Sequence, residues 1–207
     1  MLQHQINPHF INNTLQAMKA LSLEGQSEKV SRIATMLGRF LNYAVYEPYQ
    51  TVALETEVEY VKNYIELQNI RYNDRILFDC NLEEGTQGLM MPKMTLQPMI
   101  ENCIHHGLGS EGTLTITVSA EIDARGIVVF IYDDGGGISE EKLAEIRENL
   151  TINNVYKNNR SIGIVNVNER LYRRFGEAYQ MDIRSHTGYG TTIIMKFPLP
   201  KEMEENT

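Results

Sequence analysis

The stretch DDGGGI (residues 133–138) decides how the second half of the chain folds. It begins at the end of residues 127–133, where a run of apolar side chains predicts a buried strand. A carboxylate at the end of a strand can accept a hydrogen bond from an exocyclic amine, and glycines beside it let the backbone approach a flat ligand closely. By itself the run is more typical of a plain turn, so the surrounding segments have to decide between a turn and a ligand site.

The segments around DDGGGI predict an α+β sandwich. Period-two hydrophobicity predicts strands at 76–82, 113–122, 127–133, 180–186 and 191–197. Helical patterns lie between them at 93–107, 140–150 and 163–175. Strand pairs separated by helices favour one sheet covered by helices on one face. Residues 151–161 are polar and rich in asparagine, which predicts an exposed mobile loop.

The first half of the chain has a helical period instead. Apolar residues spaced three and four apart predict three helices before residue 74, the second of them ended by Pro48. We therefore expect a helical region at 1–74, a second domain at 75–200 and a disordered charged tail at 201–207. Three short helices bury little surface on their own, so we expect them to pair in a homodimer.

Composition restricts the possible partners and the cellular compartment. The 207 residues carry a formal net charge of -8, which argues against nucleic acid. Cys80 and Cys103 have neither disulfide-framework nor zinc-ligand spacing, which fits a reducing cytosol. The sequence contains no apolar run long enough to cross a bilayer. If a membrane sensor belongs to this protein, we expect it in an upstream segment, with these residues forming a cytoplasmic portion.

The stretch ENCIHHG (residues 101–107) ends a predicted helix and groups three polar side chains. Asn102 lies three and four residues before His105 and His106, so all three can share one helix face. An amide oxygen suits magnesium, which keeps most of its waters and also binds phosphate oxygens. An ordinary polar helix end before a stopping glycine explains the same residues.

Two further segments complete the pattern. SIGIVNV (residues 161–167) joins a polar loop to a helix start, where free N–H groups can hold phosphate. GYGTT (residues 188–192) leads into the last predicted strand, although a hairpin turn explains it equally well.

Together and in this order, the four segments resemble the nucleotide-binding domain shared by histidine kinases, type II topoisomerases, mismatch-repair clamps and heat-shock chaperone ATPases. The resemblance covers residues 93–198. It implies that ATP and magnesium are bound, with Asn102 on magnesium and Asp133 reading the adenine amine. Residues 151–161 would form a lid over the phosphates. The other implied nucleotide-binding residues are His105, His106, Gly135, Gly137, Ile138, Lys157, Arg160, Gly163 and either Thr191 or Thr192.

The first half resembles the LytS type of sensor histidine kinases. QINPHF (5–10) with NTL (13–15) looks like its phosphoacceptor segment, and residues 57–71 and 96–102 match the same family. The resemblance implies autophosphorylation on His9 and then transfer to an aspartate of a response regulator. Asn13 lies one turn beyond His9, and we expect it either to position a water for dephosphorylation of the regulator or to be an ordinary exposed residue.

Two alternatives remain from sequence alone, a clamp ATPase and a nucleotide-binding pseudokinase scaffold. In the hydrolytic relatives a glutamate one turn before the magnesium asparagine activates water, and Pro98 stands at that position here. Glu101 projects about 100° away from Asn102 around the helix, so it either touches magnesium-bound water or is only a solvated residue. The missing base favours phosphotransfer over hydrolysis.

Overall fold

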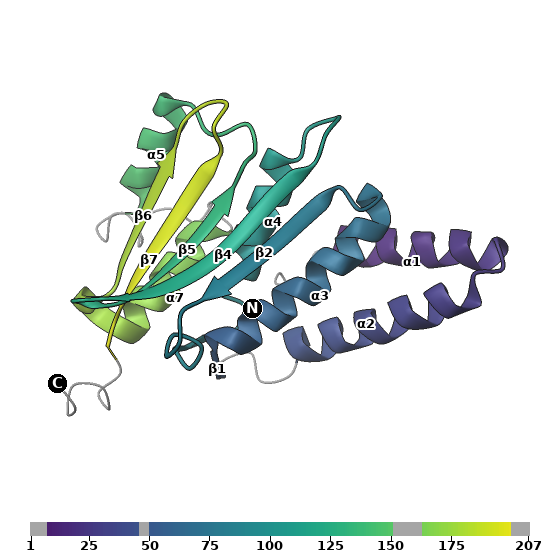
Figure 1. The fold of residues 1–207 in the computed structure, drawn as a ribbon, viewed down its shortest axis with the longest axis horizontal. Helices are drawn as coiled ribbons and strands as arrows, with labels where there is room; N and C mark the ends of the chain where they lie inside the picture. Colours follow the sequence, from purple (N-terminus) through teal and green to yellow (C-terminus); the bar gives the residue numbers. More distant parts are fainter. Residues whose placement is uncertain (1–7, 46–49, 151–162, 200–207) are drawn as a thin grey trace.

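The computed structural model describes residues 8–45, 50–150 and 163–199. Three helices come first, as predicted: α1 (Pro8–Leu23), α2 (Ser27–Val45) and α3 (Leu54–Tyr72). Figure 1 shows α1 and α2 as a hairpin that extends away from the sheet, with α3 beside it. The buried side chains of α2 recur at helical spacing, which is why this face packs on α1 and α3: Ile33, Met36, Leu37, Phe40 and Ala44.

A five-stranded mixed sheet forms the second half. Its strands are β2 (Ile76–Leu82), β4 (Leu114–Asp123), β5 (Gly126–Asp133), β6 (Gln180–Ser185) and β7 (Thr191–Pro198). The spatial order is β2-β4-β5-β7-β6; β2 and β4 are parallel and the other neighbours antiparallel. All five strands were predicted, with ends that differ by at most one residue.

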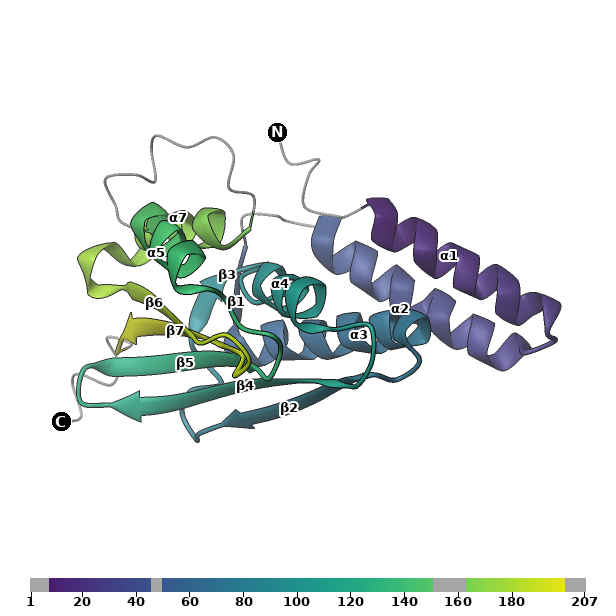
Figure 2. The ribbon, with the colours of Figure 1, turned by 90° about the horizontal axis from the view of Figure 1, so that it is seen from above.

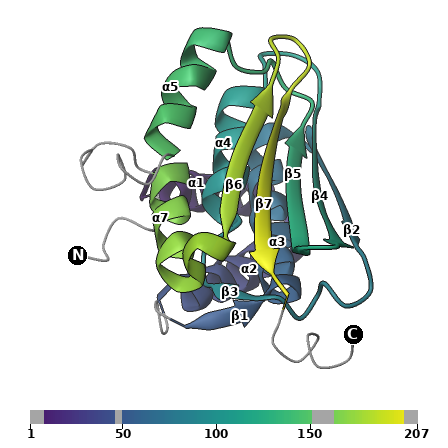
Figure 3. The ribbon, with the colours of Figure 1, turned by 90° about the vertical axis from the view of Figure 1, so that its left-hand side faces the viewer.

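One face of this sheet carries the helices. Figures 2 and 3 show α3, α4 (Gln97–Gly107), α5 (Glu140–Leu150) and α7 (Ile164–Phe175) on the same side, with the 3-10 turn η1 (Gly176–Ala178) after α7. Buried and accessible residues alternate along β2 and most of β4, and the buried side chains of the strands enter one core with the helices. The predicted α+β sandwich, covered on one face, is confirmed.

The helix predicted from residue 93 begins later, at Gln97. Residues 93–96 instead form a turn in which Met94 has a φ of 61°, a conformation that no helix contains. Before it, β3 (Met90–Pro92) pairs antiparallel with β1 (Thr51–Ala53) in a small two-stranded sheet. Three residues are too few to show an alternating pattern, so neither strand was predicted.

Helix α3 packs on α2 and also on β2 and α4. The buried side chains of both halves therefore form one continuous core, and the domain boundary at residue 74 stays a prediction. The expected lid and the expected disordered tail lie outside the described residues. None of the described helices is both long and apolar enough to cross a membrane.

Candidate functional site

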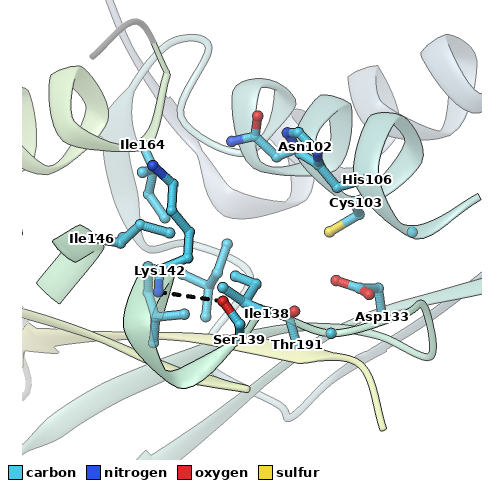
Figure 4. A pocket seen from close by; sticks show the side chains of 14 residues that line it. Asn102, Cys103, His106, Asp133, Ile138, Ser139, Lys142, Ile146, Ile164 and Thr191 are labelled. Atoms are coloured by element: carbon cyan, nitrogen blue, oxygen red, sulfur yellow. Dashed lines mark hydrogen bonds between the residues drawn. The ribbon is translucent and has the colours of Figure 1, made fainter. Parts of the chain in front are cut away.

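A cavity of about 560 Å³ lies between the sheet and helices α4, α5 and α7. Figure 4 shows the side chains that point into it from these elements. The lining combines a few polar groups with an apolar floor: Asn102, Cys103, His106, Gly107, Asp133, Gly137, Ile138, Ser139, Lys142, Ile146, Ile164, Ile183, Thr191 and Ile193. A cavity of this size and composition is suited to a ligand with one flat apolar part and a polar edge.

Asp133 is the buried carboxylate of this cavity. It ends β5 and is only 5% exposed. Its Oδ1 accepts a hydrogen bond from the Gly135 backbone N–H at 3.0 Å. Burial raises the pKa of Asp133, although the hydrogen bonds from Gly135 and from the Cys103 thiol act in the opposite direction. The carboxylate lines the cavity, where it can accept a hydrogen bond from a ligand donor.

Glycine is required at two positions of the DDGGGI stretch. A Cβ on Gly135 would lie 2.4 Å from the Gly107 Cα, so the absent side chain lets the end of α4 touch this loop. Gly137 has a φ of +69°, and a Cβ there would lie 2.1 Å from the His186 carbonyl oxygen. The glycines therefore bring α4 and the β6–β7 turn against Asp133, as a ligand site needs and a plain turn does not.

Ser185 links the two loops at the floor of the cavity. Its Oγ accepts from the Ile138 N–H at 2.8 Å, donates to the Gly190 carbonyl at 2.8 Å, and lies 2.9 Å from Thr191 Oγ1. Thr191 lines the cavity, whereas Thr192 points to the other face of β7 because side chains alternate along a strand. Of the two predicted threonines, Thr191 is the one at the site.

Helix α4 serves two cavities. Asn102 and His106 line the cavity beside Asp133, and they also line a second cavity of about 660 Å³. Glu101 and His105 line only the second one. Burial raises the pKa of Glu101, which accepts a hydrogen bond from Gln97 Nε2 at 2.7 Å, while burial and the charge of His105 lower the pKa of His106. The face predicted for α4 is therefore divided between two neighbouring spaces.

The second cavity contains His9. It is built from α1, α3 and α4, and its lining residues are His9, Phe10, Tyr64, Gln68, Arg71, Tyr72, Arg75, Glu101, Asn102, Ile104, His105, His106, Leu108 and Gly109. His9 is exposed, and the Asn13 amide nitrogen lies 3.2 Å from its Nδ1 and 3.3 Å from its Nε2. The expected one-turn spacing thus brings Asn13 into contact with the imidazole.

Phe10 fixes the position of α1. Its ring is 5% exposed and packs against Phe40 and Tyr64 at centroid distances of 4.9 and 5.1 Å. The aromatic cluster continues through Tyr60 to Tyr43. Because Phe10 follows His9 directly, its burial turns His9 toward the second cavity. The apolar residue found beside His9 therefore has a structural function that sequence reasoning missed.

A buried glutamate fixes the beginning of α4. Glu57 on α3 has no exposed surface, and its carboxylate accepts hydrogen bonds from the N–H groups of Met94, Thr95 and Leu96 at 2.7–2.9 Å. Tyr43 O–H donates to it at 2.6 Å. Successive N–H groups in such a turn form a natural anion site. On the other side of the turn, Arg170 of α7 donates to the Met94 carbonyl at 2.7 Å.

Several predicted site residues remain to be placed. Lys157 and Arg160, expected over the phosphates, lie outside the described residues. Gly163 precedes α7, and a Cβ on it would lie 3.6 Å from Asn102 Nδ2, so the expected loop-to-helix junction does lie beside Asn102. Sequence reasoning missed the cavity residues Ser139, Lys142 and Ile146 around α5. Their polar and apolar spacing is that of any surface helix, so no sequence signal distinguishes them.

Comparison with known proteins finds family matches over two parts of the chain. A family model described as histidine kinase matches residues 1–76, and one described as histidine kinase-, DNA gyrase B-, and HSP90-like ATPase matches residues 91–201. Sensor histidine kinase YesM of Bacillus subtilis is 30% identical over 98% of this chain and 33% of its own length. Sensor protein kinase HptS of Staphylococcus aureus is 30% identical over 97% of this chain and 38% of its own.

This chain therefore spans about a third of the length of those relatives. Among solved structures, the catalytic domain of histidine kinase ThkA aligns with a TM-score of 0.51 at 15% identity, covering 72% of this chain and 95% of that one. At this identity the likeness concerns the fold alone.

Proposed function

The chain belongs to the histidine kinases within the histidine kinase-, DNA gyrase B- and HSP90-like ATPase family, and on that premise we propose that it transfers the γ-phosphoryl group of ATP to His9. The phosphohistidine then donates this group to an aspartate of a response regulator. The observation that carries the proposal is that Asn102 and His106 line both the cavity of Asp133 and the cavity of His9. A nucleotide bound in the first cavity therefore has its phosphate end directed toward the acceptor.

Adenine recognition is assigned to the buried end of the first cavity. The Asp133 carboxylate accepts the hydrogen bond of the exocyclic amine, and Thr191 lies beside it. Gly135 and Gly137 let the end of α4 and the β6–β7 turn close around Asp133, and Ile138, Ile146 and Ile193 supply apolar contact to the flat base. The phosphates then extend past Asn102 toward α7 and the His9 cavity.

The residues present also fit magnesium. Asn102 has a half-exposed amide that faces the cavity, and the structure gives it no hydrogen-bond partner among the described residues. One amide oxygen suits an ion that takes its other ligands from water and phosphate. Bound magnesium would neutralise phosphate charge during the transfer. Asn102 is accordingly proposed to hold the ion against the phosphate chain.

The transfer itself needs only positioning and charge neutralisation from the protein. An unprotonated ring nitrogen of His9 gives its lone pair to the γ-phosphorus. The bond from that phosphorus to the bridging oxygen breaks, and the oxygen leaves with its electron pair on ADP. The proton on the other ring nitrogen is then released to solvent. The Asn13 amide, now against the ring, has to move aside or orient the second nitrogen.

Hydrolysis is the less suitable activity for this site. Pro98 occupies the first turn of α4, one turn before Asn102, where it offers no proton acceptor. Glu101 faces the His9 cavity rather than the cavity of Asp133. A carboxylate in that place serves the acceptor side of the reaction. This chain therefore lacks the water-activating base that a clamp ATPase would carry one turn before Asn102.

The wider assignments follow from the family. We propose a homodimer through the first two helices, supported by Leu15, Leu23 and Val45, which are 49%, 82% and 62% exposed. We also propose that this is the cytoplasmic kinase core of a longer membrane sensor, since the relatives named as sensors extend well beyond the matched region. Asn13 is proposed to position a water when the regulator is dephosphorylated. Unchanged regulator dephosphorylation in Asn13→Ala would contradict that role.

The deciding experiment incubates the purified chain with γ-labelled ATP and magnesium, beside His9→Gln and Asn102→Ala. We expect acid-labile, alkali-stable label on the wild type and on neither variant. Label that persists on His9→Gln would move the acceptor elsewhere. ATP binding without any label would favour the pseudokinase, and released phosphate without labelled protein would favour the ATPase.

A further inference from the structure

The cavity around His9 contains an arginine to which neither the sequence nor the nucleotide cavity assigns a function. Arg71 lies in the last turn of α3 and lines this cavity together with His9 from α1 and Asn102 from α4. It is absent from the lining of the cavity beside Asp133. Arg71 therefore belongs to the part of the site that contains the acceptor His9, and not to the part proposed to bind the adenine ring.

Arg71 has N–H donors that make no hydrogen bond to the described part of the protein. The two permanent cations in the lining are Arg71 and Arg75. Arg75 Nε donates to the Gly112 carbonyl at 2.6 Å and its Nη2 to the Gly109 carbonyl at 2.7 Å, so that side chain holds the loop after α4. Arg71 is exposed and stacks on the Tyr72 ring at 5.0 Å, and it has no ion pair within the described parts of the chain.

Two other polar groups of the cavity are weaker partners for an anion. Burial and the neighbouring His105 lower the pKa of His106, which reduces the positive charge that this ring carries near neutral pH. Glu101 can only repel an anion when it is ionised. Among the described residues that line this space, Arg71 is the permanent cation whose guanidinium makes no hydrogen bond to the protein, so it is available to a phosphoryl group that approaches His9.

We propose that Arg71 binds the phosphoryl group as it passes to His9, and that it neutralises the charge on the phosphoryl oxygens during the transfer. The planar guanidinium presents paired N–H groups that match two phosphoryl oxygens. This inference rests on the proposed kinase function and adds a phosphoryl-binding residue to it. Because Arg71 does not line the nucleotide cavity, it acts on the transfer step and leaves ATP affinity unchanged.

The test separates binding from transfer in single-turnover experiments. The rate of labelling at saturating ATP and the Kd for ATP are measured for wild type, Arg71→Gln and Arg71→Lys. Removal of a donor from a developing anion commonly slows a reaction by about 10²–10³-fold. Arg71 is exposed to solvent, so we expect a loss of about tenfold to a hundredfold in Arg71→Gln, with partial recovery in Arg71→Lys. The control is Arg32→Gln, which removes only a surface ion pair with Glu66.

Each outcome decides between the two proposals. A slowed transfer with an unchanged Kd and an unchanged melting temperature supports the role of Arg71. A rate in Arg71→Gln within twofold of wild type overturns it and leaves the kinase function intact. An equal loss in ATP affinity and rate also overturns it, because Arg71 would then act on the nucleotide. A wild-type chain that takes no label refutes the kinase function itself, before any Arg71 variant is compared.

Discussion

Glu57→Gln is the substitution that best tests how the site is held in place. Glutamine has the same size as glutamate, so packing is preserved and only the hydrogen bonds change. The carboxylate accepts four bonds: Oε1 from Tyr43 O–H and Met94 N–H, and Oε2 from Thr95 N–H and Leu96 N–H. An amide has one acceptor oxygen, and its NH₂ group must face two of these donors.

The least costly arrangement keeps the amide oxygen on Thr95 and Leu96. Tyr43 can then rotate its hydroxyl and accept, but the buried Met94 N–H has no acceptor. An orphaned buried donor costs about 1–3 kcal/mol, and each of the two retained bonds loses about 1 kcal/mol with the charge. We therefore expect Glu57→Gln to lower the free energy of unfolding by about 3–5 kcal/mol. In a chain of this length that corresponds to a melting temperature lower by about 6–20 °C.

The assay is urea unfolding followed by circular dichroism, with Glu59→Gln as the control. Glu59 lies on the same helix but is exposed, so its substitution should change the free energy of unfolding by less than about 0.5 kcal/mol. The turn at residues 93–96 leads directly into α4, so we also expect weaker ATP binding by Glu57→Gln. A loss below 1 kcal/mol would show that water or a rearranged turn satisfies these N–H groups, and would refute the reasoning.

Four other tests examine separate parts of the site. Phe10→Ala should destabilise the chain by about 3 kcal/mol and slow labelling of His9 more than it weakens ATP binding, because the ring anchors α1. Thermal melts and labelling rates check this. Equal effects on labelling and on ATP binding would contradict it. Gly135→Ala should weaken ATP binding at least tenfold, whereas Gly136→Ala, where a Cβ meets nothing within 4 Å, should not; calorimetry decides. Burial raises the pKa of Asp133, so ATP affinity should fall on acidification at a pH above the ordinary aspartate range. The variant Asp133→Asn should lack this fall in affinity. Parallel pH profiles of ATP affinity for wild type and Asp133→Asn would disprove the prediction. Mixed His9→Gln and Asn102→Ala chains should stay unlabelled, since His9 and Asn102 of one chain share a cavity; label on the Asn102→Ala chain would mean transfer between subunits.

The elements that sequence predicts well are those whose pattern repeats. Strands β2 and β4 and helix α5 have enough residues to show their period, and their ends follow from it to within one residue. DDGGGI and Asn102 could be assigned to one site only through the resemblance of the four segments to the nucleotide-binding domain, because each segment alone also fits an ordinary turn or helix end. Their joint position around one cavity then follows from the fold.

The residues that sequence missed act through long-range contacts. A glutamate on a helix normally faces solvent, so nothing near Glu57 in sequence indicates that it binds N–H groups 37–39 residues away. Ser185 has the same character, because Ile138 is 47 residues distant. The delayed start of α4 follows from Glu57 too: the carboxylate stabilises a turn that helical propensity alone does not predict.

Helix α3 carries both of the residues on which the two halves of the site depend. Glu57 in its first turn holds the start of α4, and Arg71 in its last turn lines the cavity that contains His9. The two positions are about 21 Å apart along a helix that rises 1.5 Å per residue. Substitutions so far apart add when the helix between them is rigid. The double variant Glu57→Gln, Arg71→Gln should therefore show the stability loss of the first substitution and the transfer loss of the second. Its transfer rate, as a fraction of the wild-type rate, should equal the product of the fractions measured for the two single variants. A double variant that transfers much faster or slower than this product would mean that α3 shifts when its anchor is removed, and that Glu57 also sets the distance between Arg71 and His9.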